Sequence, residues 1–240
     1  LPVNVCHDGN YLSYGVEKVE IPDQADVDKF LGEKNINWHV ALDPERPMAV
    51  DPLTGGATGA GPAMFVRYRK GTCKGMQNAL NVICDVHAEW EKRFGRGYAP
   101  LIEEYRLDDA ECAIVTIGCM TGAAREAVDI ARDEGEKVGL IRVKTLRPYP
   151  QKAMLAAISK VKAIGVVDRS VSFGWNSGPV FQEVLGSLYR LPQRIPAVSF
   201  IGGLAGADIT IEHFREVIAT TLRALKGNVP DEPVWINENE

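Results

Sequence analysis

Residues 111–143, ECAIVTIGCMTGAAREAVDIARDEGEKVGLIRV, contain the pattern that decides the fold. The apolar run at 113–117 ends at a glycine and predicts a strand that is buried on both faces. Apolar residues then recur at helical spacing and predict a helix from Thr121 to about Glu134, which Gly135 ends. A second apolar run follows at 138–143. The segment is therefore a predicted strand–helix–strand unit.

The alternation of strand and helix continues to the end of the chain. The further predicted elements are a helix over about 151–160, a strand over 163–167, a helix over about 178–189, a strand over 197–201 and a helix over about 211–225. Strands that are apolar on both faces and alternate with helices are typical of parallel strands buried between helix layers. The sequence therefore predicts an α/β domain with a doubly wound, mostly parallel sheet over residues 111–240.

Residues before 111 are less regular. We expect a strand at Pro2–Cys6 and a short helix that begins near Pro22 with Asp23 as its cap. The stretch 42–62 is rich in proline and glycine and predicts a linker or a long ordered loop. Apolar residues at helical spacing over 72–94 predict one long helix. We expect four parts: the tail of another domain (1–40), a crossing segment (41–71), the long helix with a connector (72–110) and the α/β domain (111–240).

Composition restricts the class of protein. The 240 residues have 45% hydrophobic content and a net charge of −5, which argues against a nucleic-acid-binding module. No apolar run is long enough for a membrane span, and no secretory signal is visible. The chain opens abruptly on Leu1-Pro2-Val3, so either the start is processed or the chain is a piece of something longer.

The cysteines indicate a reducing compartment. There are five of them, without any C-x-x-C spacing, at positions 6, 73, 84, 112 and 119. An odd, scattered set favours structural free thiols over a disulfide framework, a zinc site or an iron–sulfur centre. We therefore expect a cytoplasmic protein. The four histidines show no metal-ligand spacing, and no Ser/His/Asp order or pair of catalytic carboxylates stands out.

Two glycine-rich segments are weak candidates for phosphate binding. The segment 55–61, GGATGAG, lacks the Lys-Ser/Thr of a P-loop, and a linker or subunit-contact loop is the favoured interpretation. The segment 118–122, GCMTG, joins a predicted strand to a helix but departs from G-x-G-x-x-G. Close packing of strand against helix accounts for its glycines better than a dinucleotide site does.

Polar residues at the carboxyl ends of predicted strands are better placed. Asp168, Arg169 and Ser170 follow the third strand, and Arg147 follows the second. Ligands of open parallel sheets lie at those ends. Asp168 and Arg169 can pair with each other, contact a neighbouring subunit or face a site. We expect these four residues to belong to an interface or to the edge of a site.

A series of short segments spread over nearly the whole chain adds a family resemblance. They are LPV (1–3), DG (8–9), VEIPDQ (19–24), ALDPERP (41–47), MQNA (76–79), EYRLDDAE (104–111), GAAREAV (122–128), KVGL (137–140), LRPYP (146–150), VDRSVSFG (167–174) and IGGLAGADIT (201–210). Together they resemble the carboxyl-terminal part of the alpha subunit of pyruvate:ferredoxin oxidoreductases, in the 2-oxoacid:ferredoxin oxidoreductase family. The resemblance implies the tail of a thiamine pyrimidine-type domain, followed by a domain similar to the carboxyl-terminal domain of transketolase.

The resemblance also implies an activity and a division of labour. Pyruvate is oxidatively decarboxylated to acetyl-CoA, and ferredoxin is reduced. Thiamine diphosphate, Mg and iron–sulfur clusters belong to the whole complex, and none is expected on this segment, which contains neither the activating Glu nor the substrate-binding Arg of the family. Scaffold and subunit contacts are its expected role. Its expected partners are other subunits or domains, with ferredoxin and coenzyme A reached through the complex, and neither nucleic acid nor a membrane.

The chain departs from the family in several places. Ser13-Tyr14 stands where a Ser-His pair is common, 51–61 is unusually rich in glycine, and 68–73 differs from the usual polar run. These departures leave a 2-oxoacid with an aryl or larger acyl group as an alternative to pyruvate. Two further alternatives stay open: a transketolase-like thiamine enzyme with a different acceptor, and a non-catalytic α/β interaction domain.

Overall fold

The computed structural model describes residues 1, 3–9, 11–32, 45 and 61–238. It divides the chain into two compact units. The first comprises Leu1–Pro2 and Glu17–Tyr98, and the second comprises Val3–Val16 and Ala99–Glu240. The second unit contains the whole sheet.

The sheet of the second unit has six strands in the order β1-β3-β2-β4-β5-β6. The strands are β1 (Ile102–Tyr105), β2 (Cys112–Ile117), β3 (Val138–Val143), β4 (Ala163–Asp168), β5 (Ala197–Ile201) and β6 (Val234–Trp235). Only β1 is antiparallel, pairing Ile102 with Val143 at the edge of the sheet. The four central strands are parallel, with Cys112 of β2 opposite both Val138 and Ala163.

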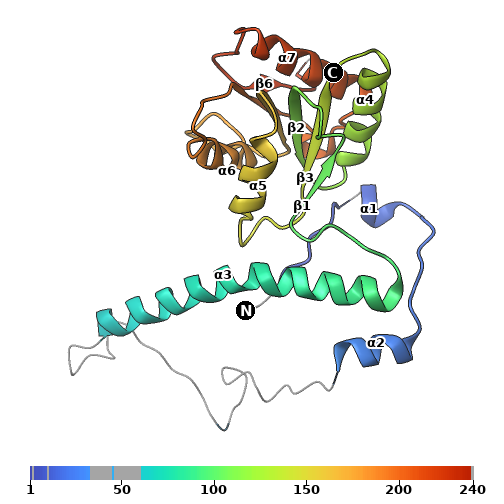
Figure 1. Ribbon diagram of the computed structural model, residues 1–240, viewed down its shortest axis with the longest axis vertical. Coiled ribbons are helices and arrows are strands. Elements are labelled where there is room, and N and C mark those ends of the chain that lie inside the picture. Colours follow the sequence, from blue (N-terminus) through green and yellow to red (C-terminus); the bar gives the residue numbers. More distant parts are fainter. Residues whose placement is uncertain (2, 10, 33–44, 46–60, 239–240) are drawn as a thin grey trace. The chain divides into compact units, whose positions relative to one another are not determined.

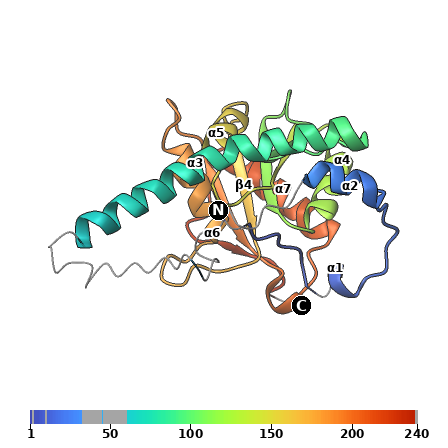
Figure 2. The ribbon, with the colours of Figure 1, turned by 90° about the horizontal axis from the view of Figure 1, so that it is seen from below.

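Helices cover both faces of this sheet (Figures 1 and 2). α4 (Thr121–Asp133) and α7 (Ile211–Leu225) lie on one face, and α5 (Gln151–Ile158) and α6 (Pro179–Leu188) lie on the other. Short α1 (Tyr11–Tyr14) follows the segment that contains Asp8. Parallel strands need crossover connections, and the helices supply them while burying both faces. The doubly wound α/β domain is confirmed.

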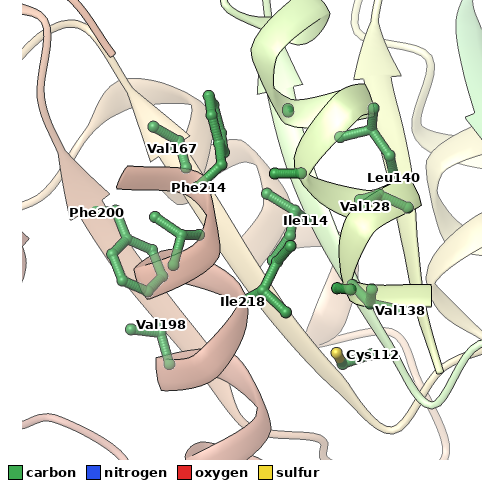
Figure 3. Packing of buried hydrophobic residues seen from close by; sticks show 14 of the residues in the cluster. Cys112, Ile114, Val128, Val138, Leu140, Val167, Val198, Phe200, Phe214 and Ile218 are labelled. Carbon is green, nitrogen blue, oxygen red and sulfur yellow. The ribbon is translucent and has the colours of Figure 1, made fainter. Parts of the chain in front are cut away.

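Two hydrophobic clusters, one on each face, hold the layers together. Side chains alternate along each strand, so that Cys112 and Ile114 of β2 face α4 and α7, while Ala113 and Val115 face α5 and α6. Figure 3 shows Phe214 and Ile218 of α7 among the residues that pack on the first face. Burying a large apolar side chain contributes about 1.5–3 kcal/mol, which explains why these strands read as continuous apolar runs.

The first unit consists of two helices, α2 (Gln24–Leu31) and α3 (Gly61–Phe94). Phe30 of α2 packs edge-on against Trp90 and Phe94 of α3, with ring centroids 5.5 and 5.8 Å apart. Asp23 precedes α2 as expected, but its side chain makes no capping hydrogen bond. The long helix begins at Gly61 and not at Thr72. Pro62 does not interrupt the helix, because a proline is compatible with the first turn.

Other expectations need correction. Residues 3–6 form no strand, and Pro2 lies outside the described residues. β1 and β6 have no counterpart among the predicted elements. They are short, and β1 is only half-buried, so neither has a long apolar run. Within the described residues, no helix combines the length and the apolar character needed to cross a membrane.

Candidate functional site

The order of the strands places two loops side by side. In the sheet, β2 and β4 are neighbours. The connection that leaves β2 leads to β3 on one side of the pair, and the connection that leaves β4 leads to β5 on the other side, so the two connections diverge. Such a switch point opens a crevice at the carboxyl ends of the two strands, and ligands of doubly wound folds bind there. Here the crevice lies between Gly118–Met120 after β2 and Arg169 after β4.

The amino-terminal part of the unit contributes Asp8 to this crevice. The Asp8 carboxylate accepts a hydrogen bond from the backbone N–H of Cys119, at 3.1 Å, just before α4. Its other oxygen accepts one from Nη1 of Arg169, at 2.7 Å. The same Nη1 lies 3.5 Å from Sγ of Cys119. A backbone N–H at a helix start, together with a guanidinium, is a favourable environment for an anion, and here Asp8 is that anion.

The charges of this cluster determine its chemistry. Hydrogen bonding from the Cys119 side chain, helped by its backbone N–H and by Arg169, holds the pKa of Asp8 below its ordinary value. Burial and the neighbouring Asp8 carboxylate raise the pKa of the Cys119 thiol. A thiol whose pKa is raised is a poor nucleophile near neutral pH. The cluster therefore stabilises an ion pair and does not activate the cysteine.

A small pocket adjoins the cluster. It has a volume of about 210 Å³, and its lining residues are Cys119, Met120, Ala123, Arg169, Ala207, Asp208 and Ile209. Pockets for cofactors and drug-sized ligands are commonly about 300–1,000 Å³. The one guanidinium at its wall already contacts Asp8. The pocket does not fit a diphosphate-bearing cofactor.

Asp168 is a structural residue. The residue is only 1% exposed. Its carboxylate accepts hydrogen bonds from the backbone N–H groups of Val180 and Phe181 at 2.8 and 3.0 Å. Asp168 is the last residue of β4, and its carboxylate thereby satisfies backbone N–H groups at the start of α6 that have no partner within the helix. Burial raises the pKa of Asp168 to about 6, against the opposing effect of the two N–H donors. Asp168 and Arg169 do not pair with each other.

The remaining predicted residues lie nearby but not together. Arg147 is exposed and pairs with Glu183 of α6. Ser170 is exposed in the bend that follows Arg169. Arg147 and Asp168 thus contact α6, whereas Arg169 contacts Asp8. Their role at an interface or at the edge of a site stays a prediction.

The glycines after β2 do not have the role expected from packing. Gly118 has a φ of +77°, a conformation that favours glycine, and Gly122 is exposed with no atom within 4 Å of the position that a Cβ would occupy. Gly118 therefore serves the turn that presents the Cys119 N–H to Asp8. Residues 55–60 lie outside the described residues, and Gly61 is the first residue of α3.

Sequence reasoning missed Asp8 and Cys119 as partners of Arg169. Asp8 is 161 residues from Arg169, and no spacing rule connects them. The only local signal was the Asp8-Gly9 pair, a common turn dipeptide. The contact of Asp8 with Cys119 and Arg169 exists only in the folded chain, in which the amino-terminal segment lies at the carboxyl ends of the strands.

A second pocket, also about 210 Å³, lies between α7 and the segment around β6. Its lining residues are Phe200, His213, Glu216, Val217, Thr220, Val234, Trp235, Ile236, Asn237 and Glu238. His213 is already engaged by Thr210, since the two form a capping box at the start of α7. Over the described part of the chain, no three His, Cys, Asp or Glu side chains are grouped as metal ligands. This pocket has no grouping that indicates catalysis.

Comparison with known proteins complements the geometry. Residues 110–214 match the sequence profile of pyruvate:ferredoxin oxidoreductase core domain II. The chain is 67% identical over 241 residues to the NADH-dependent phenylglyoxylate dehydrogenase subunit alpha of Aromatoleum evansii, covering 100% of this chain and 58% of that protein. It is 37% identical over 237 residues to the pyruvate synthase subunit PorA of Pyrococcus abyssi, covering 98% and 58%.

The chain thus spans less than two thirds of the length of these curated relatives. Among solved structures, a split-gene transketolase matches at 16% identity with a TM-score of 0.43, covering 53% of this chain and 43% of that one.

Proposed function

Because this chain belongs to the 2-oxoacid:ferredoxin oxidoreductase family, we propose that it is the carboxyl-terminal part of the alpha subunit of a 2-oxoacid oxidoreductase. The observation that carries the proposal is the 67% identity, over the whole chain, to the alpha subunit of a phenylglyoxylate dehydrogenase. The identity to a pyruvate synthase subunit is 37% over nearly the same length. The proposed substrate is therefore an aryl 2-oxoacid, with phenylglyoxylate as its representative.

The proposed reaction is an oxidative decarboxylation. The bond between the carboxylate and the 2-oxo carbon breaks and CO₂ leaves. The acyl group is transferred to the sulfur of coenzyme A, the thiol proton is released, and two electrons pass to an acceptor. NAD⁺ is the proposed final acceptor, in keeping with the name of the phenylglyoxylate dehydrogenase.

We assign this segment a scaffold role within that enzyme. The charged residues of the candidate site are already engaged: Asp8 with Arg169, Asp168 with the start of α6, and Arg147 with Glu183. The residues present do not fit thiamine diphosphate and its Mg ion, because the crevice is small and its guanidinium is paired. Thiamine diphosphate and the iron–sulfur clusters are therefore proposed to bind elsewhere in the complex.

Pyruvate with ferredoxin is the second candidate. It is supported by the profile over residues 110–214, whose name refers to pyruvate:ferredoxin oxidoreductase, and by the similarity to pyruvate synthase. The two candidates share the fold and the overall reaction. They differ in the size of the acyl group and in the electron acceptor.

The test is steady-state kinetics of the complex purified through this subunit. Phenylglyoxylate, pyruvate and a branched-chain 2-oxoacid are each supplied with coenzyme A, and NAD⁺, ferredoxin or a viologen dye is the acceptor. We expect phenylglyoxylate to have a kcat/KM at least about tenfold above that of pyruvate, with NADH as a product. A preference for pyruvate with ferredoxin would replace the first candidate by the second. If no oxoacid reduces any acceptor, both oxidoreductase candidates fail, and the alternatives that remain are a transketolase-like thiamine enzyme with a different acceptor and a non-catalytic interaction domain.

A further inference from the structure

The pocket between α7 and the segment around β6 has the character of a binding groove (Figure 1). We call it the α7 groove, and its volume is about 210 Å³. Its floor is apolar, because Phe200 and Val217, each 1% exposed, line it together with Val234. Trp235 lines it as well and is 46% exposed. A half-exposed indole ring beside an apolar floor is typical of a surface that binds a partner.

One wall of the α7 groove is the segment after β6, which hydrogen bonds hold in place. The N–H of Ile236 donates to the carbonyl of Ile201 at 2.8 Å. The Asn237 side chain accepts a hydrogen bond from the N–H of Gly203 at 3.0 Å and donates one to the carbonyl of Asp208 at 2.9 Å. Asn237 also has a φ of +67°, which is uncommon for a residue other than glycine. Such conformations are concentrated at binding sites, where the surrounding contacts impose them, so this wall is preorganised.

The charges along the α7 groove are negative. Glu216 of α7 and Glu238 after β6 both line it, and no Lys or Arg is among its lining residues. Within the part of the chain that the structure describes, neither carboxylate takes part in an ion pair. The guanidinium groups nearby are engaged: Arg215 pairs with two other carboxylates, and Arg223 donates to the hydroxyl of Thr220 at 2.8 Å. The groove therefore presents two carboxylates to a cationic partner.

These features together select the chemistry of the occupant. Two carboxylates repel phosphate groups, which disfavours coenzyme A and nucleotides. The volume is below that of common pockets for drug-sized ligands, so it suits one long side chain. An arginine side chain pairs with carboxylates through its planar guanidinium, stacks on an indole ring and covers an apolar floor with its aliphatic stem. A lysine ammonium is a point charge and does not stack in this way.

We propose that the α7 groove receives an arginine side chain from another subunit of the oxidoreductase, held by Trp235, Glu216 and Glu238. The inference rests on the proposed function, because it requires a complex of several subunits. The phenylglyoxylate dehydrogenase relative is itself named as one subunit, alpha. Asp8 ties the amino-terminal segment to the crevice between β2 and β4, whereas the groove lies at the edge strand β6, which β5 separates from β4. The groove is thus left to a different partner.

The first test identifies the occupant in the purified complex that contains the complete alpha subunit. Photo-reactive benzoylphenylalanine replaces Trp235, and the matched control carries it in place of Tyr189, an exposed aromatic that follows α6 on the other face of the sheet. We expect position 235, and not position 189, to cross-link to an arginine-containing peptide of another subunit. Cross-links only within the alpha subunit, only to a second alpha subunit, or to no protein at all would overturn the proposal.

The second test measures the contribution of the two carboxylates to assembly. Glu216→Gln and Glu238→Gln each remove one negative charge at nearly constant size, so each should raise the Kd for the cross-linked subunit about tenfold. Asp231→Asn removes an exposed carboxylate that does not line the groove, and it should leave the Kd unchanged. Analytical ultracentrifugation over a range of concentrations gives the Kd without any turnover. Equal Kd values in all four complexes would contradict the proposal.

Reversal of the charges tests the contact itself. Glu216→Arg places two guanidinium groups against each other, so it should raise the Kd more than Glu216→Gln does, by about 100-fold. Replacing the cross-linked arginine of the other subunit by glutamate should then bring the Kd back to within about tenfold of that of the parent complex. If the second replacement weakens the complex further, the arginine does not contact Glu216 and the proposal fails.

These tests also separate the inference from the proposed function, because none of them depends on catalysis. A complex that oxidises a 2-oxoacid but gives no cross-link from position 235 to another subunit would overturn the inference alone. A complex that oxidises no 2-oxoacid but shows the cross-link and the charge dependence would overturn the proposed function and leave the arginine contact in place.

Discussion

Asp8 and Arg169 form an ion pair with a 2.7 Å contact between Oδ1 and Nη1, across 161 residues of sequence. Their side chains are only 25% and 21% exposed, so the pair is screened less than a surface pair. Because Asp8 also accepts the N–H of Cys119, it connects the amino-terminal segment to the loops after both β2 and β4. The pair thus ties the switch point of the sheet to the segment that precedes it.

The Cys119 thiol reports on this ion pair. Replacing Asp8 by Asn removes a negative charge next to the thiol, so the Asp8→Asn variant should have a lower Cys119 pKa and react several-fold faster with iodoacetamide near neutral pH. Loss of the ion pair should also reduce the free energy of unfolding by about 1 kcal/mol. Peptide mapping by mass spectrometry measures the rate at Cys119, with exposed Cys73 as the internal reference.

Arg169 should have the opposite effect on the thiol. The guanidinium lowers the pKa of Cys119, so Arg169→Met should slow its alkylation. Asp231→Asn, at an exposed position of the same unit, is the charge-matched control for Asp8→Asn and should leave the rate unchanged. Equal rates of Cys119 alkylation in the parent chain and in the three variants would mean that the ion pair between Asp8 and Arg169 does not form in solution.

Asp168 predicts a pH dependence of stability. Its pKa in the folded chain is about 6, above the ordinary value of 3.8, so the folded state binds the proton more tightly than the unfolded state does. The stability that Asp168 contributes is therefore complete below about pH 4 and is lost as the pH rises through 6, by about 3 kcal/mol in total. An Asn at this position does not titrate, although it presents an NH₂ group to one of the two N–H donors.

The comparison of Asp168→Asn with the parent chain tests that sign. The variant should be less stable at pH 4, and its deficit should shrink as the pH rises to 7. Urea denaturation at several pH values measures the difference, and the carbon chemical shift of the Asp168 carboxyl gives its pKa directly. A deficit that widens with pH would show that the two N–H donors outweigh burial and that the pKa is lowered.

Two glycines of the α6 region should respond in opposite ways to alanine. A Cβ on Gly178 would lie 2.0 Å from the Asp168 carboxyl, so Gly178→Ala must displace the cap and should cost about 1–3 kcal/mol. Gly186 lies within α6 with no atom within 4 Å of its Cβ position, so Gly186→Ala should stabilise by about 0.5–1 kcal/mol. Thermal unfolding of the pair measures both, and equal shifts would refute the capping role of Asp168.

Arg132 connects the end of α4 to the loops on either side of it. Its guanidinium donates to the carbonyls of Val138 and Arg106, at 2.7 and 2.5 Å, and pairs with Asp109. Arg132→Met leaves both carbonyls without this donor and should reduce the free energy of unfolding by about 2 kcal/mol. Asp109→Asn, which removes only an exposed partner, should shift the denaturation midpoint far less. If the two variants shift it equally, the ion pair and not the carbonyl contacts dominates.

Local patterns were sufficient for the central α/β domain. The strands at 138–143 and 197–201 and the helix at 211–225 have the predicted bounds. Burial on both faces forces a strand to be apolar throughout, and burial of one helix face forces a 3.6-residue period, so both features are visible in sequence. β1 and β6 were not visible, because a short, half-buried strand at the edge of a sheet is subject to neither constraint.

The candidate site was predictable only in its location. The carboxyl ends of parallel strands follow from the alternation of elements, and Arg147, Asp168, Arg169 and Ser170 were placed there correctly. Which of them pair could not be predicted, because pairing depends on the register of distant segments. Asp168 turned towards α6, while Arg169 turned towards Asp8.

By itself the sequence determined the layered α/β architecture and the family resemblance, because periodicity and short segments are local properties of a chain. Tertiary structure alone decided that Asp8 occupies the switch point, that Asp168 is a helix cap and that Glu216 and Glu238 line one groove. The physical reason is the same in each case. Hydrogen bonds, ion pairs and burial depend on distances between residues far apart in sequence, and those distances exist only after the sheet has formed.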